Sequence, residues 1–229
     1  MAIRLSEIEA RVLGVLIEKS MTQLDTYPLT LNAVVLGCNQ KTNREPVTNL
    51  SEGQVAGALH ELQKWQLVSL ADTQRGARAN RFQHEAEKRF GWNAAQRALM
   101  AELLLRGPQT LGELRGRAAR MTPLGDAAYL TELMDELHKS PQPMVIELPR
   151  QPGQSSRRWA HLLCGAIDTA AAESPVSSTG LVEVPAAVPP PIDEGDEMLH
   201  AEVAALRAEL AELRVEVRSL RALIQPPGQ

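Results

Sequence analysis

The fold is decided by residues 51–83, which read SEGQVAGALHELQKWQLVSLADTQRGARANRFQ. Ser51 and Gln54 form a capping box that opens a helix. The apolar residues that follow at the spacing of one helix face are Val55, Leu59 and Leu62. Residues 67–70 and 81–83 are short strand-like segments on either side of a turn containing Gly and Arg. The stretch therefore predicts a helix followed by a β-hairpin.

Two further helices are expected before this stretch. Ser6 and Glu9 form a second capping box, and apolar residues at helical spacing follow them. Pro28, followed by the apolar run at residues 34–36, indicates a second helix. Three helices and a hairpin are the order of a winged helix-turn-helix, so we predict such a domain over residues 1–90.

The same order of elements recurs over residues 91–165. Helices are predicted over residues 93–106, 110–119 and 126–139, and strands over residues 144–148 and 157–161. The sequence also shows an internal repeat. The segment Glu61-Leu62-Gln63-Lys64 corresponds to Glu136-Leu137-His138-Lys139, and Phe82 corresponds to Trp159. The sequence thus predicts a second, duplicated winged-helix domain, in a fold that is mainly α with small β-hairpins.

Three motifs resemble the signature of the YceH-like family. They are CNQKTNREPV at residues 38–47, LLLRG at residues 103–107 and GELRGRAARM at residues 112–121. The resemblance extends over residues 6–163. It implies tandem winged-helix domains in a bacterial cytoplasmic protein, and it implies no activity because the family is itself uncharacterised.

The composition changes after Gly165. Residues 166–197 are rich in Ala, Ser, Pro and acidic side chains, which predicts a disordered linker. Residues 1–165 hold 20 Lys and Arg against 17 Asp and Glu, whereas residues 166–229 hold four against eleven. The head is therefore mildly basic and the acidity belongs to the tail, which excludes a bulk polycation that coats nucleic acid.

Residues 198–225 are predicted to form a parallel dimeric coiled coil. Leu at d and mostly β-branched residues at a favour two parallel strands; these positions hold Leu199, Val203, Leu206, Leu210, Leu213, Val217, Leu220 and Ile224. The g positions are glutamates and the following e positions are arginines: Glu202, Glu209 and Glu216, with Arg207, Arg214 and Arg221. An amphipathic helix docked on its own head would explain the apolar stripe but not this charge register. We therefore expect a homodimer.

Other classes of protein are disfavoured by composition. Aromatic residues make up 3 % of the chain, which argues against many β-sandwiches and most single-strand nucleic-acid platforms. Cys38 and Cys164 are too few for a disulfide scaffold or a Cys-rich zinc site. No signal peptide or membrane span is recognisable, so a cytoplasmic location is expected.

No catalytic constellation is recognisable in the sequence. The five histidines share no HxxxH or HExxH spacing, and neither a P-loop nor a G-x-G-x-x-G is present. Cys38 lies beside an apolar helix face, which predicts a buried, inert thiol. We expect no enzyme activity, no bound metal and no cofactor.

Nucleic-acid binding is predicted from the position of the cations. The wing of the first domain carries Arg75, Arg78 and Arg81, and Lys41 and Arg44 precede its third helix. Arginines on a wing can contact phosphates or reach a minor groove. The third helix carries small outward residues, which supply few hydrogen bonds for reading bases. A solvated turn that happens to contain arginines is the alternative.

The second domain is predicted to stay out of the major groove. Its third helix, residues 126–139, carries four acidic residues against Lys139, and phosphates would repel it. Its cations lie on the short second helix and around the wing: Arg115, Arg117, Arg120, Arg150, Arg157 and Arg158. Two functions remain open. One is a dimeric DNA-binding, regulatory protein, and the other is a protein-interaction scaffold without a nucleic-acid role.

The segment of residues 41–47 is long for a turn between two helices, and Pro46 stiffens it. Two roles are open for it. Lys41 and Arg44 could contact phosphate beside the third helix. Alternatively, Asn43, Arg44 and Glu45 could hydrogen-bond across to the second domain and fix the angle between the two, which we favour because Glu45 opposes a phosphate contact.

Overall fold

The computed structural model describes residues 3–71, 80–150 and 156–165. Over these residues the chain forms seven helices and five short strands, and the strands make two small antiparallel sheets. The fold is therefore mainly α with small β-hairpins, as expected from the sequence. The predicted linker (166–197) and coiled coil (198–225) lie outside the described residues.

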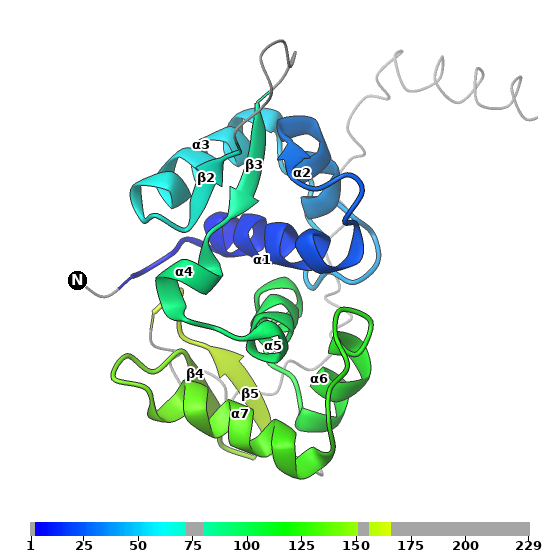
Figure 1. Ribbon diagram of the computed structural model, residues 1–229, viewed down its shortest axis with the longest axis vertical. Helices are drawn as coiled ribbons and strands as arrows, with labels where there is room; N and C mark the ends of the chain where they lie inside the picture. The colour runs from blue at the N-terminus through cyan, green and yellow to red at the C-terminus, as the bar shows by residue number, and fades with distance from the viewer. Residues whose placement is uncertain (1–2, 72–79, 151–155, 166–229) are drawn as a thin grey trace, which may run out of the picture. The chain divides into compact units, whose positions relative to one another are not determined.

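The first module, residues 3–90, begins with a helix and ends with a hairpin and a short helix (Figure 1). Its elements are α1 (Glu7–Thr22), β1 (Leu29–Thr30), α2 (Leu31–Cys38), α3 (Glu52–Lys64), β2 (Val68–Leu70), β3 (Arg81–His84) and α4 (Ala86–Phe90). The strands pair in the order β1-β3-β2, all antiparallel. The order of three helices and a hairpin is the one that the sequence predicted.

Side-chain caps decide where the helices of this module begin. The capping boxes of α1 and α3 are formed by Ser6 with Glu9 and by Ser51 with Gln54, as predicted. The start of the second helix was predicted too early, because residues 29–30 form β1 instead. Thr30 has an extended backbone, pairs with β3, and then caps α2 by accepting a hydrogen bond from the Ala33 amide.

The second module, residues 91–165, repeats this arrangement. It consists of α5 (Ala94–Arg106), α6 (Leu111–Ala118), α7 (Ala127–Lys139), β4 (Val145–Leu148) and β5 (Arg158–His161). The β1–β3 pair of Leu29 with Phe82 has its counterpart in an isolated bridge between Gln109 and Trp159. The predicted correspondence of Phe82 with Trp159 therefore extends to the residues that they pair with.

Helix α1 belongs to the core of both modules. Every residue from Ala10 to Lys19 is buried, and α1 packs along α5 of the second module (Figure 1). At Gly14, a Cβ atom would lie 3.0 Å from the Cβ of Leu104 and 3.1 Å from the side chain of Leu105. Glycine is used here because the two helices approach closely.

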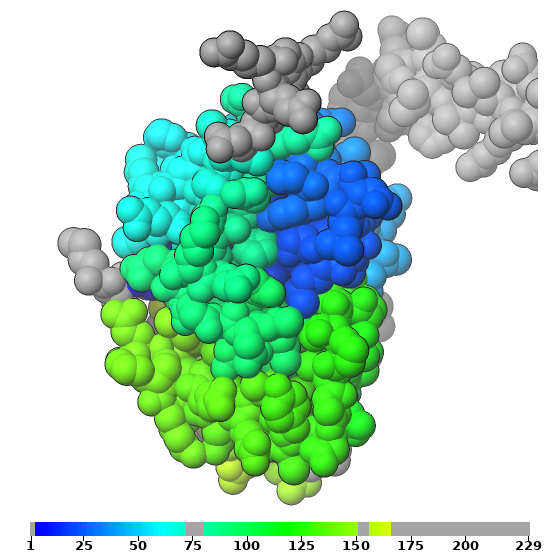
Figure 2. All heavy atoms as spheres, in the orientation of Figure 1, coloured from blue at the N-terminus to red at the C-terminus, as the bar shows by residue number. Residues whose placement is uncertain are grey.

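The two modules share one hydrophobic core, although the sequence suggested two separate domains divided near residue 90. Two backbone hydrogen bonds add to the contact, from the Leu5 amide to the Leu163 carbonyl (2.7 Å) and from the Glu45 amide to the Leu105 carbonyl (2.9 Å). The space-filling view shows side chains of both modules in contact along this face (Figure 2). The angle between the modules is therefore fixed by packing.

None of the helices in the described part of the chain is long and apolar enough to cross a membrane.

Candidate nucleic-acid interface

Arg44, predicted as a phosphate contact, is buried. Its side chain is 0 % exposed and pairs in a bidentate manner with Glu18 of α1, with Nη2 to Oε2 at 2.6 Å and Nη1 to Oε1 at 3.2 Å. The remaining donors are used by the Gly37 and Asn43 carbonyls and by the Gln40 side chain. All five N–H groups of the guanidinium thus have partners, as burial of a charge requires.

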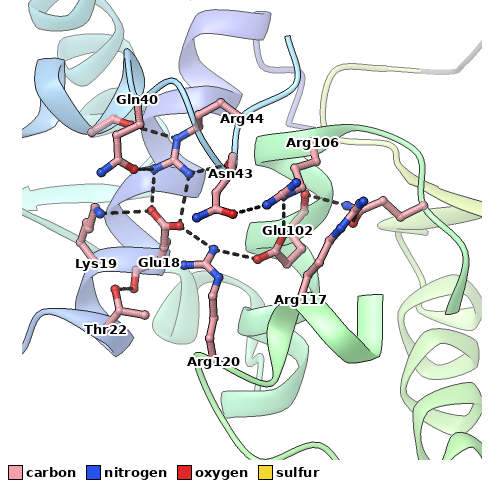
Figure 3. A network of polar contacts seen from close by, with 12 residues as sticks. Glu18, Lys19, Thr22, Gln40, Asn43, Arg44, Glu102, Arg106, Arg117 and Arg120 are labelled. Atoms are coloured by element: carbon pink, nitrogen blue, oxygen red, sulfur yellow. Dashed lines mark hydrogen bonds and ion pairs between the residues drawn. The ribbon is translucent and has the colours of Figure 1, made fainter. Parts of the chain in front are cut away.

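The same carboxylate of Glu18 reaches across to the second module (Figure 3). Nη2 of Arg120 donates to Glu18 Oε1 at 2.6 Å and to Glu102 Oε1 of α5 at 2.7 Å. Both carboxylates are buried, with side-chain exposures of 1 % and 0 %. We call Glu18, Arg44, Glu102 and Arg120 the junction network. It links α1 and the loop after α2 with α5 and the segment after α6.

Asn39, Asn43, Arg106 and Arg117, close to the junction network in the chain, belong to the motifs that carry the family resemblance. Asn43 accepts a hydrogen bond from Arg106, and Gln109 accepts one from Arg117 (2.6 Å). Asn39 uses its side-chain amide to bond both the N–H and the carbonyl of Leu50. Of the residues predicted to bond across to the second module, Asn43 does so with its side chain and Glu45 with its backbone amide, whereas Arg44 is linked to that module only through Glu18.

The contacts within the junction network shift the pKa values of Glu18 and Arg120. Burial acts to raise the pKa of Glu18, but the hydrogen bonds and charges of Arg44 and Arg120 outweigh it, so that this pKa lies below its usual value. Burial acts to lower the pKa of Arg120, and the two carboxylates more than offset it, which raises that pKa. Both shifts favour the charged forms of Glu18 and Arg120.

Three of the predicted cationic residues of the first module, Lys41, Arg44 and Arg81, lie in the described part of the chain. The prediction that Arg44 contacts phosphate at the surface is wrong, because its guanidinium is enclosed by protein groups. Lys41 is exposed. Arg81 is exposed in β3, and its Nη1 donates to the Thr26 and Pro28 carbonyls. Arg75 and Arg78 lie outside the described residues.

Helix α3 has an open outer face. A Cβ atom added at Gly53 or Gly57 would have no heavy atom within 4 Å, and His60 is exposed one turn further on. The corresponding helix of the second module, α7, exposes Glu132 and Glu136 instead. The two modules therefore present outer faces of different charge, as the sequence predicted.

The Cys38 thiol is not suited to act as a nucleophile. Cys38 is fully buried as predicted, and burial raises the pKa of its thiol to about 12, so that it stays protonated. Among the described residues, no group of three His, Cys, Asp or Glu side chains could hold a metal ion.

Several residues at the module junction were missed by sequence reasoning. Glu18 and Glu102 fall inside strongly apolar helices, and this is the one local signal that a charged partner must be near. The sequence places Arg120 only among the cations on the short second helix and around the wing of the second domain. The predicted dimerisation residues, Leu199 to Ile224, lie outside the described part of the chain.

Comparison with known proteins places these features in one family. Residues 5–154 match the family model described as "Protein of unknown function, DUF480". A UPF0502 protein of Geobacter sulfurreducens is 47 % identical over 174 residues, which cover 76 % of this chain and 78 % of the relative. A UPF0502 protein of Burkholderia orbicola is 43 % identical over 202 residues, covering 88 % and 84 %. The match includes both modules and every residue of the junction network, and the chain belongs to the DUF480 family of bacterial proteins.

Proposed function

We propose that this chain is a homodimeric, double-stranded DNA-binding protein with a regulatory role. Its two modules are winged helix-turn-helix units, and the first one contacts DNA through α3 and the β2–β3 hairpin. The element order, together with the β1-β3-β2 sheet, supports this assignment of the first module.

The observation that carries the proposal is the open face of α3. No atom of the described residues lies over Gly53 or Gly57, so the backbone of α3 can approach a nucleic-acid groove closely. Such a surface supplies few side-chain donors for base reading. Affinity then comes mainly from phosphate contacts by Lys41, Arg75, Arg78 and Arg81, the exposed or hairpin cations of the first module.

Arg81 can serve both structure and binding. Its Nη1 is used by two carbonyls, while Nε and Nη2 have no partner among the described residues. The guanidinium is thus held in place with donors left over for a phosphate. The second module supports the fold and makes no contact with the groove, since the acidic face of α7 repels phosphate.

The proposal is tested by fluorescence anisotropy on a labelled duplex of about two helical turns at several salt concentrations. The decisive variant is Gly57→Glu, which places a carboxylate on the open face of α3. Gly116→Glu on α6 is its matched control, because that helical position is equally unobstructed. We expect Gly57→Glu to abolish binding and Gly116→Glu to leave it intact, with unchanged melting temperatures for both. Equal binding by the two variants would refute the contact through α3.

The hairpin is tested separately with Arg75→Gln, Arg78→Gln and Arg81→Gln combined. The slope of log K against log salt should fall by about 2 to 3, and affinity should drop about equally for different sequences. Arg157→Gln, in the corresponding hairpin of the second module, is the control. If the slope stays the same, the hairpin makes no phosphate contact.

A protein-binding scaffold is the second candidate. It is favoured by the exposed side of α7, where Tyr129 is 41 % exposed beside the carboxylates of Glu132 and Glu136. Aromatic residues are enriched at protein interfaces. Failure of the chain to bind any duplex, together with loss of a co-purifying protein in Tyr129→Ser, would select this function instead.

A further inference from the structure

A half-open groove of about 370 Å³ lies at the module junction. It is bounded by the first turns of α1, the loop of residues 45–50, the end of α5 and residues 161–164. We call it the junction groove. Its volume lies within the range of about 300–1,000 Å³ that is common for small-molecule sites.

The junction groove contains a buried cation without a counter-ion. Arg11 is 5 % exposed, and its Nη2 donates to the Pro46 carbonyl at 2.8 Å. Its Nη1 is buried and has no hydrogen-bond partner, and no carboxylate in the described residues lies within ion-pair distance. The neighbouring Cys38 thiol is protonated and cannot balance the charge. Burial and the charge of Arg44 lower the pKa of Arg11, and the charge of Glu45 only partly offsets them. A guanidinium with an unpartnered buried N–H is costly, so an anionic hydrogen-bond partner would stabilise it.

His161, in the wall of the same groove, carries a second unsatisfied atom. Its Nδ1 is buried without a partner. Burial lowers the pKa of this ring to about 4, so it is neutral at pH 7 and can donate one hydrogen bond. Two of the unpartnered buried atoms in the described structure thus lie on residues of one groove.

The other residues of the groove indicate which further groups a ligand would carry. Glu7 and Glu45 are exposed at the groove, and neither takes part in an ion pair within the described residues. The carboxylates outnumber Arg11, so a simple anion would be repelled, whereas a zwitterion satisfies both signs. Ile8, Leu50 and Leu104 supply an apolar surface.

We propose that the junction groove binds a free α-amino acid with an apolar side chain. The carboxylate of the ligand lies on Arg11 and accepts a hydrogen bond from His161. Its ammonium faces Glu7 and Glu45, and its side chain packs on Ile8, Leu50 and Leu104. Because the groove is formed by both modules, the ligand stabilises their shared interface. This inference does not depend on the proposed DNA binding.

The test is isothermal titration calorimetry of the full chain with L-leucine and L-phenylalanine. Two matched probes remove one group each: L-leucinamide lacks the carboxylate, and 4-methylpentanoate lacks the ammonium. We expect L-leucine or L-phenylalanine to bind and each matched probe to bind at least about tenfold more weakly, because each loses a charged hydrogen bond. Equal binding of 4-methylpentanoate would overturn the assignment of an amino acid.

Two variants locate the site. Arg11→Met should abolish binding, and its folding is checked by circular dichroism. Glu45→Gln changes an exposed side chain and should weaken L-leucine, which loses a partner for its ammonium, but should not weaken 4-methylpentanoate, because the anion is then repelled less. Glu132→Gln on α7 is the matched control and should change neither. The proposal is refuted if neither amino acid, at up to about 10 mM, gives a heat of binding or a shift of the melting temperature.

Discussion

Arg81 and Arg158 make the same hydrogen bond in the two modules. Nη1 of Arg81 donates to the Pro28 carbonyl at 2.7 Å, and Nη1 of Arg158 donates to the Pro108 carbonyl at 2.9 Å. Each arginine directly precedes the aromatic residue of its hairpin, and each proline directly precedes the residue that pairs with that aromatic. Residues that correspond in the internal sequence repeat therefore make corresponding hydrogen bonds in the two modules.

The first prediction concerns these two arginines. Arg81→Gln and Arg158→Gln should each lower the free energy of unfolding by about 1 kcal/mol, because each loses a hydrogen bond to a backbone carbonyl. Urea denaturation measures the effect. Arg157→Gln, at an exposed ion pair with Glu147, should stay within about 0.5 kcal/mol of the parent. A loss at one arginine alone would contradict their equivalence.

The second prediction concerns the junction network. Glu18→Gln leaves the buried Arg44 guanidinium without its counter-ion and should cost about 3–5 kcal/mol in unfolding free energy at pH 7. The pKa of Glu18 is lowered by folding, so its stabilisation is present above the unfolded pKa and is lost as the pH falls through the folded one. The variant should therefore lose less stability than the parent on acidification.

Its control is Glu61→Gln, which removes an exposed pair with Lys64. That change should leave the urea midpoint unchanged, because water and salt screen an exposed pair. Arg44→Ala should likewise lower the melting temperature by several degrees, as a role in linking the two modules requires. An unchanged melting temperature with lost DNA affinity would instead restore Arg44 as a nucleic-acid contact.

The third prediction concerns acid sensitivity at His84. The ring accepts a hydrogen bond from the Ala86 amide at Nδ1, so Nε2 carries the proton and donates to Ser20 at 2.9 Å. Burial, together with the charge of Arg97, lowers the pKa of His84 to about 4. Unfolding therefore takes up a proton below the normal pKa, and stability falls between pH 7 and pH 5 by about 2 kcal/mol from this residue.

We expect His84→Gln to remove most of that pH dependence in urea denaturation at the two pH values. His60→Gln, at an exposed position on α3, should keep it. The same loss of stability on acidification in parent and His84→Gln would show that other groups take up the proton.

The fourth prediction concerns dimerisation by residues 198–225. Leu206→Asp with Leu213→Asp places charges at two d positions and should give monomers by light scattering. Ala201→Asp with Ala208→Asp places the same charges at outward f positions and should leave the dimer intact. A dimer that survives the first pair of changes would place the interface elsewhere.

Local signals predicted the helices well. Ser6, Asn93 and Thr110 each stand at the start of a predicted helix and cap it in the structure. Each cap depends on residues three positions apart, so the information lies within one turn. The two-residue strand β1 was missed because it exists only through its pairing with Phe82 and Arg81, more than 50 residues later.

The candidate site was harder to predict for the same reason. Arg44 and Lys41 look alike in the sequence, yet one is enclosed by Glu18 and the other is exposed. What separates them is a carboxylate on α1, 26 residues away, and the packing of the second module over it. Arg11 is not singled out by the sequence at all, because its burial and its unpartnered Nη1 are properties of the folded junction.

The burial of α1 has a consequence for how a duplicated protein can evolve. Because Gly14 packs on Leu104 and Leu105, each copy completes the interior of the other, and neither could be deleted without exposing an aliphatic surface. The outer faces are under no such constraint, and α3 and α7 differ there in charge. The two copies have been free to diverge where they meet other molecules, while they remain one cooperative folding unit where they meet each other.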